Sequence, residues 1–448
     1  MEQAALDAVV HTVSNTGFWV SIIIFAITFA IILSERIHRS VIWLLWALIM
    51  VIAWMYFGFY SPELAKEAID FNTIGLLFWM MVIVAILEHT WAFQYLWIKV
   101  AKKTWWNLWK LTVALWTLTT LLSLILDNVT TIILIVPITI IISKILKLNP
   151  TPILMAEALL SDTGWVATLV WDPPNIMIWS YAWFSFMDFI THSMPIVIVA
   201  WILTLITLKI VFKKEFKQKP NEKAIEELQS MDENKAITDM KSLKKILVVL
   251  AIVVVLFFVH HMFHIEPSMV AIIWAALALI LVSATKDPQK ILEKLELSVL
   301  LFFWALFVIV WGLEHAGVLE MLAEMITSWA NDNLFLTALI ILWVSAILSA
   351  LVDNIPMTVA MLPIIGYLQY EAQLPWVELL RWALAFGVWF GGNASPIWST
   401  ANVIVVSKSE QTDNPITFVG WMKAWLSTAF VSLMAATGWL YIMHSFFM

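Results

Sequence analysis

The chain has 448 residues, of which 62% are hydrophobic and 13% are charged, with a formal net charge of −7 at pH 7. No soluble fold has enough interior for so much apolar surface, so the composition excludes a soluble globular protein and predicts a polytopic membrane protein. Cysteine is absent, which excludes disulfides, thiolate metal sites and cysteine nucleophiles.

Apolar runs of roughly 20 residues recur along the chain, and each is long enough to cross a bilayer as a helix. The first residues, "MEQAALDAVV", carry acidic rather than basic side chains, so we expect the first run to be a retained span and not a cleaved signal peptide. The expected crossings are residues 18–34, 40–58, 73–96, 150–190, 192–212, 244–263, 267–285, 297–320, 377–407 and 418–445.

Two further apolar segments, 107–146 and 334–370, are each interrupted near the middle by polar residues, which predicts re-entrant hairpins. With that topology all lysine and arginine residues except Lys66 and Arg381 fall on one side, which the positive-inside rule assigns to the cytoplasm. Both termini are then expected outside the plasma (inner) membrane. The charged segment 213–243 is expected to be a cytoplasmic linker.

The two halves of the chain are related. "LEHTWAFQYL" at Leu87 and "LEHAGVLEML" at Leu313 are 226 positions apart, as are Asp127 and Asp353, and Pro137 and Pro363. Asn175 and Asn402 follow at a separation of 227. Several matches in order at nearly one spacing indicate an internal duplication.

The fold class expected is an all-α polytopic membrane protein built from two inverted repeats, residues 18–212 and 244–446. Each repeat has five crossings, a re-entrant hairpin and a broken helix, and the odd number of crossings inverts the second copy. Many secondary transporters have this architecture.

Polar residues at the two hairpin tips are the first candidate ion-binding residues. A carboxylate at membrane depth is costly and normally has a function. The same residues could cap the returning helices, and we expect both roles. The candidates are Asp127, Asn128, Thr130 and Thr131 in the first hairpin, and Asp353, Asn354 and Thr358 in the second.

The fourth crossing of each repeat is interrupted by proline or glycine. Unwound backbone is tolerated in a membrane only where it lines a cavity. Half-helix N-termini favour anions there, whereas freed carbonyls and side-chain oxygens favour Na⁺. A purely structural kink is the alternative for each residue. The candidates are Asp162, Thr163, Asp172 and Asn175, then Asn393, Ser395, Ser399, Thr400 and Asn402.

Two Glu-His pairs recur at matched positions and could relay protons, because imidazole titrates near neutrality. They are Glu88 with His89 and Glu314 with His315. Both pairs also lie toward the ends of their spans, where interfacial polar groups are common. His260, His261 and His264 gather at an outer helix end without a counterpart, which favours a membrane interface over metal binding. We expect no transition metal and no cofactor beyond a coupling Na⁺ or H⁺.

The motifs "LDNVTTIILIVP", "DPPNIMI" and "VDNIPMTVAMLP" resemble the ion transporter superfamily, in particular the arsenite permease, NhaD-type antiporter and pigmentation P-protein group. The resemblance is greatest to the P-protein-like branch and covers nearly the whole chain. It implies a scaffold and a mobile transport domain that carries both hairpins and both broken helices, often in a homodimer with elevator-type motion. It places the family's binding positions on Asp127 and Asn128, on Asp353 and Asn354, and on the loops ending at Asn175 and Asn402.

Tryptophan stands at several positions where glycine is expected. The chain has 28 Trp and 12 Gly, Trp91 aligns with Gly317 across the repeat, and the family pattern has glycine at Trp171 and Trp398. A tryptophan cannot cheaply adopt the positive φ that glycine supplies. Some bacterial lineages read the codon UGA as glycine, and a table that reads it as tryptophan would produce this pattern. We therefore expect glycine in the native protein at Trp91, Trp171, Trp398, Trp165 and Trp179.

Together these features predict a secondary active transporter, not an enzyme, that moves an ion or small polar solute by alternating access with Na⁺ or H⁺ coupling. Its partners are the lipid bilayer and that solute, and nucleic acid is not expected. Efflux by antiport, of the arsenite or Na⁺/H⁺ type, is preferred, because buried carboxylates without basic residues at the breaks disfavour an anionic substrate.

Three alternatives follow from the same residues. Na⁺-coupled uptake of a dicarboxylate or citrate is the alternative within transport. An intramembrane aspartyl protease also needs two membrane aspartates, but here each Asp precedes Asn in a symmetry-related hairpin, and no site for an extended peptide is evident. An ion channel would need a continuous pore.

Overall fold

The computed structural model is helical throughout the residues that it describes, with no strand among them. These residues are 15–33, 39–57, 68–88, 92–104, 107–123, 128–165, 172–182, 184–218, 226, 229–230, 239–263, 265–283, 289–293, 295, 297–330, 333–350, 354–370, 377–392 and 400–447. Within these described ranges, four stretches are long and apolar enough to cross a membrane alone: Phe186–Val211, Met240–Val259, Leu297–His315 and Val419–Phe446. Shorter apolar stretches, of 10–17 residues, lie within other described helices. Short helices are expected where crossings are broken or re-entrant.

The first half of the chain contributes α2 (Asn15–Leu33), α3 (Arg39–Phe57), α5 (Phe71–Glu88), α6 (Ala92–Thr104), α7 (Leu108–Ser123), α8 (Asn128–Leu146), α9 (Thr151–Trp165), α10 (Pro173–Ala182), α11 (Phe186–Asp188) and α12 (Met194–Val211). A single π-helical turn, Phe189–Ser193, joins α11 to α12.

The second half contributes α14 (Met240–Val259), α15 (Pro267–Ser283), α16 (Gln289–Leu292), α17 (Leu297–His315), α18 (Val318–Ala330), α19 (Leu334–Ser349), α20 (Asn354–Tyr370), α21 (Val377–Gly392), α22 (Thr400–Ser409) and α23 (Phe418–Phe447). Asp239 caps α14 by accepting from the backbone N–H groups of Lys241 and Ser242, so this helix begins four residues before the expected crossing.

The helix boundaries repeat along the chain. Helices α5 to α9 begin 226 residues before α17 to α21, and α10 begins 227 residues before α22. Pro137 inside α8 and Pro363 inside α20 occupy the same position in the two hairpins. The breaks near 128, 354, 173 and 400 are therefore as expected, although the inversion of the second repeat stays a prediction.

The third crossing of each repeat is shorter than expected. The expected spans 73–96 and 297–320 are wrong at their ends, because α5 stops at Glu88 and α17 at His315. In the second repeat Gly317, with φ of 78°, ends α17 and turns the chain into α18. α6 and α18 are separate helices. They were not predicted, because the apolar sequence continues from α5 and α17 into them.

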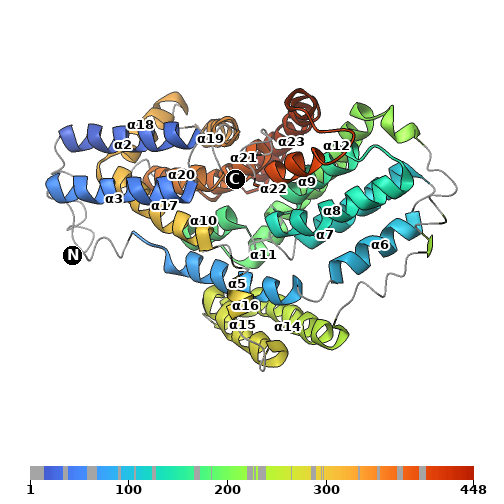
Figure 1. Ribbon diagram of the computed structural model, residues 1–448. Coiled ribbons are helices and arrows are strands. Elements are labelled where there is room, and N and C mark those ends of the chain that lie inside the picture. Colours follow the sequence, from blue (N-terminus) through green and yellow to red (C-terminus); the bar gives the residue numbers. More distant parts are fainter. Residues whose placement is uncertain are drawn as a thin grey trace.

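Equivalent helices of the two repeats make exchanged contacts. α3 packs against α17 and α5 against α15, and Figure 1 shows α2 and α3 beside α17, with α14 and α15 beside α5. The broken helices exchange as well, since α10 contacts α20 and α21 whereas α22 contacts α8 and α9. Each second half-helix thus packs against the hairpin of the other repeat.

Glycine allows α21 to approach α19 closely. A Cβ at Gly387 would meet the carbonyl oxygen of Leu342, and one at Gly391 would meet the backbone of Ala346. Glycines four residues apart lie on one helix face, and small residues let membrane helices pack backbone to backbone. This contact holds the first half of the second broken helix against its hairpin.

Candidate functional site

After each predicted hairpin tip a helix begins at an asparagine. α8 begins at Asn128 and α20 at Asn354, so each returning helix presents its N-terminus at the hairpin tip. The predicted carboxylates Asp127 and Asp353 directly precede these starts and lie outside the described residues. The structure gives the helix positions of Asn128 and Thr130 but not their side chains.

The tip of the second hairpin is held against α21 by polar contacts. The Ser349 hydroxyl oxygen lies 2.6 Å from Oδ1 of Asn354 and 2.8 Å from the carbonyl oxygen of Val388. The Asn354 side chain also lies directly against Gly392, the last residue of α21. Asn354 is therefore fixed where the second hairpin meets the second helix break.

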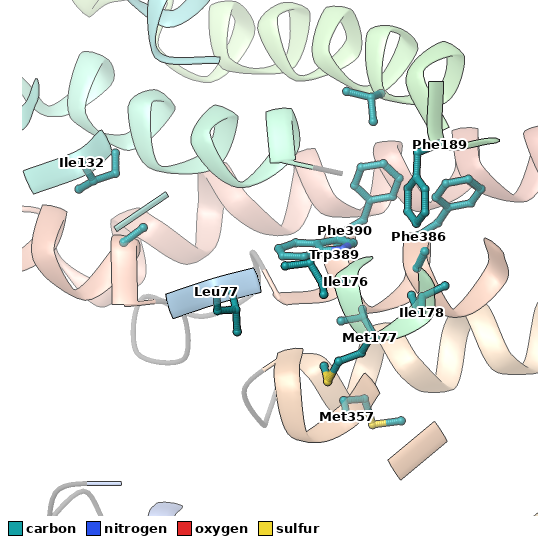
Figure 2. Packing of buried hydrophobic residues seen from close by; sticks show 14 of the residues in the cluster. Leu77, Ile132, Ile176, Met177, Ile178, Phe189, Met357, Phe386, Trp389 and Phe390 are labelled. Carbon is teal, nitrogen blue, oxygen red and sulfur yellow. The ribbon is translucent and has the colours of Figure 1, made fainter. Parts of the chain in front are cut away.

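An aspartate caps the helix that follows the first break. Oδ2 of Asp172 accepts a hydrogen bond of 3.0 Å from the backbone N–H of Asn175, which caps α10. Asp172 and Asn175 are both fully buried. Figure 2 shows Ile176, Met177 and Ile178 of α10 beside Phe386, Trp389 and Phe390 of α21 and Met357 of α20. Asn175 thus lies where α10 meets the hairpin of the second repeat.

The second break repeats this arrangement with the partners exchanged. Asn402 lies in the first turn of α22 and is fully buried, and α22 packs against α8 and α9. Thr400 begins α22, with its side chain outside the described part, and Asn393, Ser395 and Ser399 lie outside the described residues. Asn175 and Asn402 are therefore equivalent, each at the start of a half-helix seated on the opposite hairpin.

The predicted threonines divide into two kinds. Thr131 is fully buried, and its hydroxyl has no hydrogen-bond partner among the described residues. The Thr358 hydroxyl instead donates to the carbonyl oxygen of Asn354 at 3.0 Å, within α20. Asp162 and Thr163 lie in the last turns of α9, but their side chains are outside the described part. Of these, Thr131 has the hydroxyl that is available to a ligand.

The four helix starts have a common electrostatic property. The N-termini of α8, α10, α20 and α22 all lie at the hairpin tips and breaks, and a helix N-terminus carries partial positive charge and N–H donors. The described side chains at these starts, Asp172, Asn175, Asn354 and Asn402, supply oxygens and include no Lys or Arg. The arrangement can bind a polar solute through amides and a cation through oxygens.

In the second Glu-His pair the two side chains have different surroundings. Nδ1 of His315 donates to the carbonyl oxygen of Trp311 at 3.0 Å, and the imidazole stacks on that indole. Glu314 instead lines a cavity of about 280 Å³ together with Asp70, Ser180 and Tyr181. His89 and the side chain of Glu88 lie outside the described part. The relay stays a prediction.

A second cavity, of about 560 Å³, lies at the other end of α8. Its lining includes Ser143, Lys144, Lys147, Gln218 and Asn414. These residues come from the end of α8 and from loops that the positive-inside rule assigns to the cytoplasm. The Glu314 cavity is lined by Asp70 just before α5, by α10 and α17, and by the middle of α20, in a region that the same topology places toward the outside.

Most of the tryptophans expected to be glycine lie outside the part of the chain that the structure describes. Trp91, Trp171 and Trp398 lie outside the described residues, and so does the side chain of Trp165. Trp179 is buried in α10, with its ring centroid 6.2 Å from that of His260. Lys147 is the only described residue other than glycine with positive φ, so the conformational reason does not apply to Trp179.

One buried acid was missed by the analysis of the sequence. Glu157 in α9 is fully buried and accepts a hydrogen bond from Thr139 of α8. Glu157 has no acidic counterpart in the second repeat, so the internal duplication does not indicate it. Its position as the only acid in the run "TPILMAEALL" was the available signal.

Comparison with known proteins gives a consistent answer. A family model described as "Citrate transporter" matches residues 29–387. The "46 kDa membrane protein" of Mycobacterium leprae is 34% identical over 431 residues, covering 95% of this chain and 98% of that protein. An uncharacterized transporter of Mycobacterium tuberculosis is 36% identical over 434 residues, covering 96% and 99%.

The predicted resemblance to P proteins is confirmed. The human P protein is 28% identical over 508 residues, covering 96% of this chain and 60% of the P protein. The crystal structure of the YdaH transporter of Alcanivorax borkumensis aligns with a TM-score of 0.61 at 10% identity, covering 92% of this chain and 99% of that one. The structural likeness confirms the all-α transporter fold.

Proposed function

The chain belongs to the citrate transporter family, and we propose that this membrane transporter works by secondary active transport, exporting an ion or small polar solute in exchange for Na⁺ or H⁺. The observation that carries the proposal is the pair Asn175 and Asn402. Both amides are fully buried at half-helix starts, and each half-helix packs against the hairpin of the other repeat. A solute held there contacts both repeats, so their relative movement would change its exposure.

Antiport is supported by the kind of groups near the breaks. Asp172 and Glu157 are both buried, and neither α9 nor α10 contains a Lys or Arg residue. A carboxylate in a poorly solvated place holds a proton or a cation, and one excludes the other. Competition for one carboxylate is the simplest physical basis for exchange.

Na⁺-coupled uptake of citrate or a dicarboxylate is the second candidate. Two observations favour it: the description of the matching family model and the four helix N-termini at the breaks. The side chains at the breaks supply no positive charge, so such an anion would be bound through N–H groups and through Na⁺.

The deciding experiment is a flux panel with purified full-length protein in liposomes. Na⁺, arsenite and citrate are each supplied under an imposed pH gradient, and accumulation is measured with and without Na⁺. Proton-driven movement of Na⁺ or arsenite against its gradient supports antiport, whereas Na⁺-driven accumulation of citrate supports the second candidate. Movement that only dissipates gradients would indicate a channel and refute both. Empty liposomes and liposomes with Asn402→Ala protein are the controls.

A further inference from the structure

A chain of three polar side chains crosses from α6 to α9 inside the first repeat. Nε1 of Trp97 donates to the Thr139 hydroxyl oxygen at 3.0 Å, and Thr139 lies 2.6 Å from Oε1 of Glu157. All three residues are fully buried. Because an indole N–H can only donate, the Thr139 oxygen is the acceptor there, and its own proton is directed to Glu157.

The surroundings of the second carboxyl oxygen of Glu157 indicate that the side chain is neutral in this conformation. Oε2 is buried and has no hydrogen-bond partner among the described residues. An ionised carboxylate without a counter-ion is strongly disfavoured in a dry interior. Since Oε1 already accepts the Thr139 hydroxyl, the proton of a neutral Glu157 lies on Oε2.

Hydroxyl groups extend from this carboxyl toward water. Ser143 follows Thr139 by one turn on α8 and lines the cavity of about 560 Å³. Ser143 is buried, and its hydroxyl has no partner among the described residues. The cavity therefore reaches within one helix turn of the group that contacts Glu157.

The polar groups continue in the other direction toward the helix break. Ser161 follows Glu157 by one turn on α9 and lies 2.8 Å from the Ser123 hydroxyl oxygen, at the end of α7. Asp162, a predicted ligand, is the next residue. Glu157 thus lies between a water-accessible cavity and the first helix break.

The second repeat shows that the fold does not require this chain of groups. At an offset of 226, the positions of Trp97, Thr139 and Glu157 are Ala323, Ile365 and Ala383. The corresponding helices α18, α20 and α21 nevertheless pack together as α6, α8 and α9 do. A buried acid that is dispensable for packing and costly to bury is expected to have a function.

We propose that Glu157 is a proton-carrying residue on the lysine-rich side of the transporter, with Thr139 and Trp97 as its positioning residues. In this conformation Oε2 holds the proton. When the α8 and α9 contact loosens during the cycle, the proton passes to water in the Ser143 cavity and leaves a carboxylate stabilised by the Thr139 hydroxyl. The return of a proton from water restores the neutral acid. Its role in coupling rests on the proposed function, whereas its exchange with water does not.

The charged groups around Glu157 are compatible with this assignment. The helices that pack against α9 are α7, α8, α12, α21 and α22. The titratable residues of these neighbouring helices lie toward helix ends; they are Lys110, Lys144, Lys209, Glu378, Arg381 and Lys408. α9 itself adds Asp162. The four lysines are at the ends nearest the Ser143 cavity, where they favour departure of a proton.

Infrared difference spectroscopy of the full-length protein in phosphatidylcholine liposomes tests the proposal without any transported solute. The C=O stretching band of a protonated carboxyl is followed between acidic and alkaline pH in H₂O and D₂O. We expect a band that titrates reversibly, that is lost in Glu157→Gln, and that shifts in frequency in Thr139→Val. Glu378→Gln, which removes an exposed acid of α21, should leave it unchanged.

A band that Glu157→Gln does not remove would overturn the assignment. So would a band that this variant removes but that never titrates while the protein stays folded, since Glu157 would then be a permanently neutral core residue. If Glu157→Gln does not fold, the unshifted band of Thr139→Val is the refuting result. A flux panel that finds no proton coupling, together with a titrating band, would count against the proposed function alone.

Discussion

The side-chain amide of Asn354 occupies the space that a Cβ atom at Gly392 would need. The contact joins the tip of the second hairpin to the end of the half-helix that precedes the second break. The position of a predicted ligand therefore depends on the absence of a side chain at Gly392, the last residue of α21 before the second break.

Gly392→Ala should displace Asn354 and reduce transport by at least about ten-fold, because neither the hairpin nor α21 can move away without breaking its own contacts. Gly438→Ala is the matched control, since a Cβ there meets nothing within 4 Å. In a helix interior that control should gain up to about 1 kcal/mol of folding free energy. Flux assays and thermal unfolding of both variants are the measurements. Equal activity of the two alanine variants would show that the contact does not position Asn354.

Ser349→Ala should weaken solute binding more than it slows turnover. The hydroxyl links Asn354 to the carbonyl oxygen of Val388, and a lost hydrogen bond of this kind costs about 0.5–1.5 kcal/mol. If Asn354 binds the solute, KM should rise roughly five-fold. Ser445→Ala removes only an exposed hydroxyl bonded within α23 and should leave KM unchanged. A lower melting temperature with an unaltered KM would limit Ser349 to a structural role.

Asn175→Ala and Asn402→Ala should reduce transport to a similar extent, because the two amides are equivalent and both are buried at half-helix starts. Removing a hydrogen-bonding group that meets a ligand costs about 1–3 kcal/mol, so the solute affinity should fall by roughly ten-fold or more. Size-exclusion profiles should remain those of the unsubstituted protein. Gln411→Ala, at an exposed position after α22, is the control. Loss in one variant only would show that the two breaks are not equivalent in binding.

Asp127→Asn and Asp353→Asn should each abolish coupled transport and leave folding intact, since the carboxylate is predicted to hold the coupling proton or cation. The two residues are predicted to approach a common midplane site from opposite sides of the membrane. The test is the dependence of flux on pH and Na⁺ in each variant. Unchanged dependence in both would leave these residues with a capping role.

The helix breaks could be predicted from the sequence, because proline and polar residues interrupt apolar runs there. The breaks before Asn128, Pro173, Asn354 and Thr400 follow from proline and polar residues in apolar sequence, and the repeat offset fixes their pairing. The separate helix α6 was missed because apolar residues continue past Glu88. Its counterpart α18 is separated from α17 by the backbone conformation of Gly317.

Glu157 was missed for a different reason. Its partners Trp97 and Thr139 lie on two other helices, and the sequence alone does not give the helix packing that brings them together. The exchange of α10 and α22 between hairpins is likewise a property of the three-dimensional arrangement. Local pattern indicates that helices break, whereas tertiary contacts determine which oxygens meet there.

We predict that the native protein has glycine in place of several tryptophans. Two glycines of the second repeat give the physical reason. Gly317 has φ of 78°, and its counterpart is Trp91. Gly391 lies against the backbone of Ala346, and its counterpart is Trp165. A bulky residue in the left-handed region is strained by roughly 1–3 kcal/mol, and an indole cannot fit where two helix backbones touch.

We therefore expect protein from the native host to carry glycine at positions 91 and 165, and also at Trp171 and Trp398. Peptide mass spectrometry would show the mass of glycine in place of that of tryptophan, and the gene would carry UGA codons at these sites. Trp109 and Trp116, which pack edge to face with ring centroids 5.8 Å apart, are the control positions where tryptophan should be found. UGG codons at positions 91, 171 and 398 would refute the prediction. In that case Trp91→Gly and Trp165→Gly should raise the melting temperature, because each removes the strain that its counterpart in the second repeat avoids.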